Sequence, residues 1–168
     1  MLKVGESVLF ESMVICEYLD EISPPSLHPP DPLNKAVNRS WIDFSSELFA
    51  NLYRVAHATE LNEFVQRCQE AREKLERLEQ QLDGGPFFNG PDFSMMDAAI
   101  APAFFRLSLM ESIRPLPLLE QLPKVGVWSQ ALLSRDSVSN SVVPEFSQLY
   151  RDNLAESDSY LCRCAAQS

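Results

Sequence analysis

Several residue types that carry chemistry are scarce in this sequence. Its 168 residues include only five glycines, four cysteines and two histidines, and the histidines, His28 and His57, lie far apart. We find no glycine-rich phosphate loop, no histidine at metal-ligand spacing and no nucleophile with a histidine beside it. The sequence therefore lacks the common signatures of nucleotide binding, of metal binding and of catalysis by a triad.

Basic residues and long apolar runs are scarce as well. Lys and Arg number 14 against 24 Asp and Glu, and the net charge of −10 argues against a nucleic-acid or anionic-membrane partner. No apolar run reaches membrane-spanning length, and the first residues show no secretory leader pattern. The four cysteines lack partners at metal-ligand spacing, so we expect reduced thiols, no bound metal and a cytoplasmic protein; they are Cys16, Cys68, Cys162 and Cys164.

The stretch from Phe87 to Leu109 organises the rest of the chain. Turn formers at residues 89–92 precede Ser94 and Asp97, which have the spacing of a capping box, with Asp in place of the usual Glu or Gln. Residues 98–109 are almost wholly apolar, which predicts a helix buried on all sides, and Pro102 predicts a kink in it. As a cap alone, Asp97 would contribute on the order of 1 kcal/mol to stability.

The first ten residues predict a β-hairpin. Strands at 2–4 and 7–10 flank Gly5 and Glu6, which fit a two-residue turn. A lone hairpin is marginally stable in water, and everything after residue 10 is predicted as helix or turn. We therefore expect the hairpin to be the edge of a sheet whose remainder lies outside the given sequence. Ser12 is expected to cap a helix over residues 13–22.

A proline-rich linker separates this region from a predicted bundle of helices. Five of the twelve prolines lie between residues 24 and 32. Apolar spacing predicts long amphipathic helices from 32 to about 57 and from 61 to 82. Further helices are expected at 116–122, at 123–134 and from 144 onward. Residues 135–143 are expected to be irregular, and the tail beyond 156 is expected to fray.

One polar pair, Glu11 and Ser12, lies at a strand-to-helix junction. A helix N-terminus presents free N–H groups and a positive dipole end, which attract a carboxylate, and the Ser12 hydroxyl adds a hydrogen bond. Glu11 can pair with an ammonium group, so the pair can hold an amino-acid moiety that carries both charges. Taken alone, these residues favour a simpler interpretation, with Ser12 as a cap and Glu11 as an exposed strand end, because such caps are common.

Two motifs carry a resemblance to a known family. LFESMVICEYLDE at residues 9–21 resembles the Leu-x-Glu-Ser-x-x-Ile-x-x-Tyr-Leu motif near the end of the thioredoxin-like domain of cytosolic glutathione S-transferases. GPDFSMMDA at residues 90–98 resembles the second family signature, the capping box and buried helix of the all-helical C-terminal domain. The proline-rich linker is similar to the segment that joins the two domains in this family. The residues of the first motif are most similar to those of omega-like or related bacterial members.

The resemblance implies a mainly α fold in three parts. Residues 1–24 are expected to be the last hairpin and helix of a thioredoxin-like domain, 25–31 a linker and 32–168 the all-helical C-terminal domain. Ser94 and Asp97 are then the structural capping pair. A homodimer is also implied, with the helices at 37–55 and 61–82 at its interface.

The resemblance also implies an enzyme that, in its complete form, conjugates glutathione to electrophiles or reduces glutathione mixed disulfides. Glutathione is the expected co-substrate: Ser12 would bind its γ-glutamyl α-carboxylate, and Glu11 would help hold the α-amino group. Trp41, Phe44 and Ser45 would face a small hydrophobic electrophile. Core packing is the simpler interpretation of Trp41 and Phe44, because both lie on the apolar stripe of their helix.

The sequence departs from the family pattern at its start. It begins about where the residue after the family's cis-proline stands, so the catalytic Ser, Cys or Tyr is expected upstream of Met1. The chain as given is therefore expected to be N-terminally truncated and inactive. Two other functions stay open: a non-catalytic binding or regulatory module, and a chain whose exposed hairpin pairs with another copy.

Overall fold

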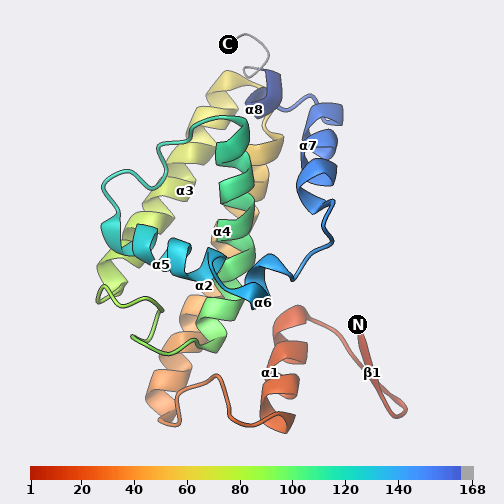
Figure 1. The fold of residues 1–168 in the computed structure, drawn as a ribbon, viewed down its shortest axis with the longest axis vertical. Coiled ribbons are helices and arrows are strands. Elements are labelled where there is room, and N and C mark those ends of the chain that lie inside the picture. Colours follow the sequence, from red (N-terminus) through yellow and green to blue (C-terminus); the bar gives the residue numbers. More distant parts are fainter. Residues whose placement is uncertain (164–168) are drawn as a thin grey trace.

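The computed structural model describes residues 1–163, and it is mainly helical (Figure 1). This confirms the predicted fold class. The elements in chain order are β1 (Leu2–Val4), β2 (Ser7–Leu9), α1 (Ser12–Ile22), α2 (Pro32–His57), α3 (Leu61–Gln81), α4 (Met95–Ile113), α5 (Pro123–Leu133), α6 (Asp136–Ser139), α7 (Phe146–Glu156) and α8 (Tyr160–Arg163).

The N-terminal hairpin stands apart from the helices in Figure 1. Strands β1 and β2 pair antiparallel with Leu2 opposite Leu9 and Val4 opposite Ser7. Gly5 turns the chain with φ 58°, a conformation that glycine adopts without strain. Among the described residues the sheet consists of these two strands, so both of its edges are unpaired there.

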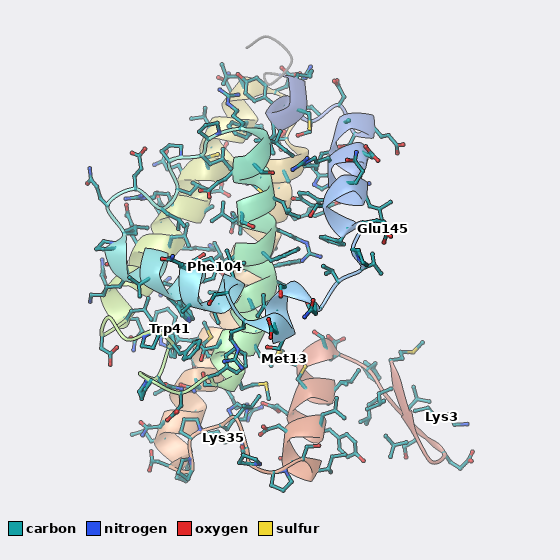
Figure 2. The ribbon with its side chains drawn as sticks, viewed as in Figure 1. Lys3, Met13, Lys35, Trp41, Phe104 and Glu145 are labelled. Atoms are coloured by element: carbon teal, nitrogen blue, oxygen red, sulfur yellow. The ribbon has the colours of Figure 1, made fainter. Side chains whose placement is uncertain are left out.

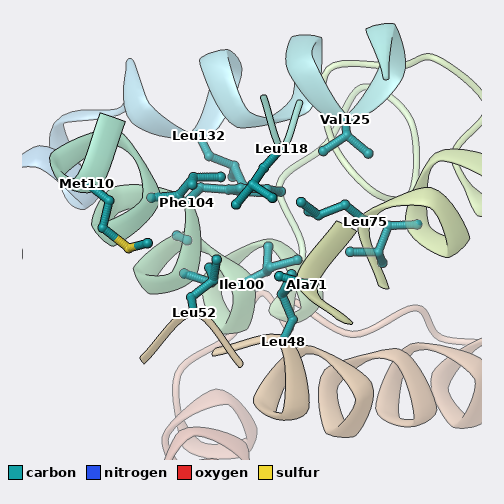
Figure 3. Packing of buried hydrophobic residues seen from close by; sticks show 14 of the residues in the cluster. Leu48, Leu52, Ala71, Leu75, Ile100, Phe104, Met110, Leu118, Val125 and Leu132 are labelled. Carbon is teal, nitrogen blue, oxygen red and sulfur yellow. The ribbon is translucent and has the colours of Figure 1, made fainter. Parts of the chain in front are cut away.

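Helix α4 lies at the centre of the helical part of the molecule (Figure 1) and packs against both α2 and α5. Along its length only Pro102 and Ser112 are exposed, which confirms the predicted burial on nearly all sides. Figure 3 shows Leu48 of α2 and Leu75 of α3 converging with Phe104 of α4 in this core. The apolar stripe of α2 therefore buries itself against α4, and the stripe of α3 packs against α2 and α5, as amphipathic helices do.

Polar side chains of α3 hold the segment that leads into α5. The Glu79 carboxylate accepts from the backbone N–H groups of Lys124 and Val125 at 3.1 and 2.8 Å, so it caps α5 from another helix. Arg72 donates to backbone carbonyls of this loop, namely those of Pro117, Leu118 and Glu120. The helix predicted at 116–122 does not form; those residues make turns whose carbonyls bond to Arg72.

The C-terminal third differs from prediction in three places. One helical turn, α6, forms within the segment predicted to be irregular, and α7 begins at Phe146, two residues after Pro144. The tail was predicted to fray beyond 156, and this was wrong as far as residue 163. The buried Ser159 hydroxyl donates to the Ala56 carbonyl, and the Tyr160 N–H donates to Ala58 at 2.8 Å, so α8 is tied to the end of α2. Cys164 lies outside the described residues.

Candidate functional site

The start of α1 differs from the predicted arrangement. The helix begins at Ser12, and Glu11 occupies the N-cap position with φ 67° and ψ 120°. Ser12 is therefore not the cap, and the Glu11 side chain makes no capping bond to any described residue. A non-glycine residue with these angles lies outside the left-handed helical region and costs about 1–3 kcal/mol. Such strained residues concentrate at binding sites.

The first turn of α1 offers hydrogen-bond donors to solvent. Glu11 and Ser12 are both exposed. The first helical bond runs from the Ile15 N–H to the Glu11 carbonyl at 3.1 Å, so the N–H groups of Ser12, Met13 and Val14 precede it. The turn contains no acidic residue. A carboxylate placed there meets backbone donors, the Ser12 hydroxyl and the positive end of the helix dipole.

A groove between α1 and α2 adjoins this turn. The Glu17 carboxylate on α1 accepts from Arg39 Nε on α2 at 2.8 Å, and Met13 packs against the core at the other end of the groove. Figure 2 labels Met13 where α1 approaches the bundle. The groove has a volume of about 410 Å³ and is lined by Met13, Val14, Glu17, Arg39, Ser40, Ile42, Asp43 and Ser46.

The linker is tied to α1 and to α4 by hydrogen bonds. The Asp20 carboxylate at the end of α1 accepts from Ser26 Oγ at 2.7 Å and from the Leu27 N–H at 2.6 Å. Burial alone would raise the pKa of Asp20, but the Leu27 and Ser26 hydrogen bonds lower it below its usual value. The Leu27 carbonyl accepts from the Met95 N–H at 3.0 Å, which links the linker to the first residue of α4.

His28, in the linker next to Leu27, has a buried imidazole ring without a hydrogen-bond partner among the described residues. Its Nε2 lies 4.0 Å from Glu17 Oε1, and neither ring nitrogen has a hydrogen-bond partner within residues 1–163. Burial and the positive charge of Lys35 lower the pKa of His28 below 6.5, although Asp20 and Glu17 oppose the shift. His28 is therefore neutral at neutral pH.

The three predicted electrophile contacts point into packed regions. Trp41 and Phe44 meet edge to face at 5.2 Å between ring centroids, Trp41 also approaches Phe88, and the Arg77 guanidinium lies over Phe44 at 4.6 Å. Ser45 is buried, and its hydroxyl donates to the Ile42 carbonyl at 2.7 Å. Neither the aromatic pair nor Ser45 lines the groove between α1 and α2.

A second cavity lies between α4 and the α6 region, with a volume of about 460 Å³. Most of its lining is apolar, and Arg106, whose guanidinium lies over the rings of Phe49 and Phe146, supplies the one cationic side chain of that lining. Pro102 has no N–H, so the carbonyl of Ala98 loses its helical donor, and both residues line the cavity. The other lining residues are Phe93, Ala101, Phe105, Ser137, Val138, Ser141 and Val142.

Sequence reasoning did not find this cavity. Its walls come from residues 93–106 and 137–142, which meet only in the folded chain, and the second segment was predicted to be irregular. Pro102 was the available signal, because a proline inside a helix frees a carbonyl that a ligand or side chain can use.

The capping pair at the start of α4 is part of a larger buried cluster. Asp97 is fully buried, and its carboxylate accepts from the Ser94 N–H at 2.8 Å and from the Ser94 hydroxyl at 2.6 Å. It also accepts from the Phe88 N–H at 2.9 Å and from Trp128 Nε1 at 2.6 Å. Asp97 therefore joins the loop before α4, the start of α4 and α5, which is a structural role.

The described thiols and acids show no metal site. Cys16, Cys68 and Cys162 are free, and burial raises the pKa of Cys68 to about 11 and also raises that of Cys162. No group of three or more possible metal-ligating residues comes together within residues 1–163. In the same part of the chain, no helix combines the length and apolar character needed to cross a membrane.

Comparison with known proteins gives consistent matches. A family model described as "Glutathione S-transferase, C-terminal domain" matches residues 48–131. The chain is 30% identical to Glutathione S-transferase U19 of Arabidopsis thaliana over 79% of this chain and 61% of that protein. It is also 30% identical to Glutathione S-transferase omega-1 of Sus scrofa, over 91% of this chain and 66% of that protein. The chain thus spans less than two thirds of the length of these two relatives.

Solved structures show the same fold. Glutathione transferase Omega 3C from Trametes versicolor has a TM-score of 0.76 at 24% identity, covering 92% of this chain and 70% of that one. A Tau class glutathione S-transferase from mango, Mangifera indica, has a TM-score of 0.73 at 23% identity, covering 89% and 73%.

Proposed function

Because this chain belongs to the glutathione S-transferase family, we propose that the first turn of α1 binds the γ-glutamyl end of glutathione. The observation that carries the proposal is the backbone of Glu11, held at φ 67° where the helix begins. Glu11 and Ser12 are adjacent in the chain and both exposed there, so a carboxylate and a hydroxyl are available at the start of the helix. The α-carboxylate of glutathione then binds the helix end, and its α-ammonium pairs with Glu11.

The reaction proposed for the complete form is transfer of the glutathione sulfur to an electrophile, or reduction of a mixed disulfide. Glutathione is the co-substrate, no metal takes part, and the cytoplasm is the proposed location. The sulfur reacts as a thiolate, so a residue must stabilise its charge. We place that residue outside these 168 residues, in keeping with the greater length of the curated relatives. Cys68, whose pKa is raised to about 11, is unsuited to thiolate chemistry.

We further propose that the electrophile binds in the cavity between α4 and the α6 region, in place of Trp41, Phe44 and Ser45. Its volume of about 460 Å³ lies in the range of small-molecule sites, and its lining is mostly apolar. Arg106 adds a cation that suits an electrophile with an electron-rich or anionic group. In the view of Figure 1, α6 lies above the first turn of α1.

A homodimer formed through α2 and α3 is also part of the proposal. Large apolar side chains stay exposed along these two helices, and burial against a second copy would remove them from water; they are Leu33, Val37, Tyr53, Leu61 and Val65. Sedimentation velocity over a range of concentrations tests this. Dissociation of a dimer supports it, and a monomer at all concentrations rejects it.

The glutathione site is tested by calorimetric titration of the purified chain with glutathione. Ser12→Ala is expected to weaken binding about tenfold, because it removes a hydrogen bond to a charged group. Ser23→Ala is the matched control, since it removes an exposed hydroxyl from the opposite end of α1. Equal affinity for wild type and Ser12→Ala, with both chains folded by circular dichroism, would reject the site.

Turnover separates the enzyme from the alternative of a non-catalytic binding or regulatory module. Conjugation of chlorodinitrobenzene by the purified 168-residue chain is expected at background. Measurable turnover would contradict the placement of the activating residue outside it. A form extended to the length of the relatives that binds glutathione without turnover would favour the binding module.

A further inference from the structure

A third cavity, of about 420 Å³, lies at the opposite end of α2 from α8. It is formed where the start of α2, the end of α3, the linker and the loop before α4 meet. Four of its lining residues carry side-chain carboxamides: Asn34, Asn38, Gln81 and Asn89. Lys35 and Trp41, both labelled in Figure 2, lie on the first part of α2, next to these lining residues. We call this cavity the carboxamide pocket.

The carboxamides of this pocket are unpaired. Asn38 is 2% exposed, and its Nδ2 has no hydrogen-bond partner within residues 1–163. The side chains of Asn34, Gln81 and Asn89 also make no hydrogen bond to any described residue, and these three are exposed at the rim. A buried amide donor without a partner is costly, so Asn38 favours a bound group that accepts its hydrogen bond.

Several amide side chains elsewhere in residues 1–163 are paired. Asn51, the other buried asparagine of α2, donates to Glu70 at 2.9 Å. Gln66 and Gln69 on α3 and Gln148 on α7 each donate to a carboxylate four residues later on their own helix. Asn38 therefore differs from Asn51, because its buried amide donor has no partner within residues 1–163.

The chemistry of the lining defines the ligand class. No residue that lines the pocket is charged, so an ionic ligand would lose water without gaining a counter-charge. An apolar ligand would leave the carboxamides desolvated. Each carboxamide both donates and accepts, as does each hydroxyl of a sugar. Pro29, Val37 and Phe88 add an apolar wall that suits the C–H face of a sugar ring.

We propose that the carboxamide pocket binds a neutral, polyhydroxylated ligand of the chemical class of mono- and disaccharides. The amides come from separate segments around a concave site. That arrangement suits a compact ligand with hydroxyls in several directions better than an extended peptide, whose groups lie along one line. The buried Asn38 supplies a donor that only the ligand can pair. The exposed Asn34, Gln81 and Asn89 supply hydrogen bonds that the ligand takes over from water.

The test is an NMR titration of the ¹⁵N-labelled full chain with maltose, trehalose and sucrose. The side-chain NH₂ signals of Asn38 and Asn89 are expected to shift and saturate with at least one of these sugars. Asn38→Leu is expected to weaken that binding about tenfold. Asn89→Ala changes an exposed residue, keeps the fold and is expected to weaken binding a few-fold, so it decides the matter if Asn38→Leu does not fold.

Gln69→Ala is the matched control, because it removes an exposed amide from α3 outside the pocket. The proposal is overturned if no sugar shifts the Asn38 signals. It is overturned equally if Asn89→Ala and Gln69→Ala bind alike, or if the peptide probe N-acetylglycinamide binds more tightly than every sugar. None of these outcomes depends on glutathione, so the proposed function stands or falls separately.

Discussion

The N-terminal segment (residues 1–24) and the helical body (residues 32–163) are held in place by different forces. Helix α1 has one buried residue, the polar Asp20, whereas α4 buries ten of its 19 residues, nearly all of them apolar. The segment is joined to the body by polar contacts such as Glu17 with Arg39, and by the packing of Met13. The difference indicates that stability resides in the body, while the proposed glutathione contacts lie in the weakly packed segment.

The largest effect is expected from Asp97→Ala in the body. The change leaves four donors in a buried region without their acceptor: the Ser94 N–H and hydroxyl, the Phe88 N–H and Trp128 Nε1. We expect a loss of about 3–5 kcal/mol in the free energy of unfolding, well above the value for a cap alone. Urea unfolding followed by circular dichroism measures it. A loss near 1 kcal/mol would show that the contacts to Phe88 and Trp128 contribute nothing.

Glu79→Ala is expected to have the next largest effect, because it removes the cap that α3 provides to α5. The loss should be about 1–2 kcal/mol, in the range of N-cap removal. Glu73→Ala on the exposed face of the same helix is the control and should cost less than about 0.5 kcal/mol. Equal urea midpoints for the two variants would mean that the Lys124 and Val125 N–H groups find other acceptors.

His28 predicts a pH dependence at the junction between the two regions. Its pKa is lower in the folded state than in the unfolded state, so unfolding takes up a proton below about pH 6.5. The stability associated with neutral His28 is complete above that pH and is lost as the pH falls towards the folded pKa. His28→Gln should flatten this part of the stability profile measured by urea unfolding between about pH 5 and 7. A variant whose profile matches that of the wild type would reject the assignment.

The smallest effect is expected from Arg39→Met, which breaks the ion pair between segment and body. Arg39 is 59% exposed, so solvent screens the pair and the loss should stay below about 0.5 kcal/mol. The change should instead loosen α1 locally, which limited proteolysis within residues 1–30 would detect as faster cleavage. A large loss of global stability would mean that segment and body unfold as one unit.

The sequence was most informative where a pattern repeats along one helix. The apolar stripes of α2 and α3 and the apolar run of α4 follow from periodicity, and the hairpin follows from Gly5 and alternating residues. It was least informative where distant residues meet. Trp128 on Asp97, Arg72 on the loop at 117–120 and Ser159 on Ala56 depend on the assembled bundle, so the predicted helix at 116–122 and the fraying tail were wrong.

The candidate site also contains features that the sequence predicted and features that it did not. Glu11 and Ser12 were found because they are adjacent in the chain at a strand-to-helix junction. The backbone strain at Glu11 leaves no local pattern, and Pro102 alone did not show that residues 137–142 would complete a cavity beside it. Trp41 and Phe44 were predicted near an electrophile because of the helix on which they lie. Spacing along that helix does not show which residues they contact, namely Phe88 for Trp41 and Arg77 for Phe44.

Hydrogen exchange of the whole chain, read by mass spectrometry, tests the difference between segment and body most directly. We expect amides of β1, β2 and α1 to exchange faster than those of α4 by at least about two orders of magnitude, because they open without global unfolding. Glutathione should slow exchange in the first turn of α1 and leave α4 unchanged. Equal protection of α1 and α4 in the free chain would contradict the account.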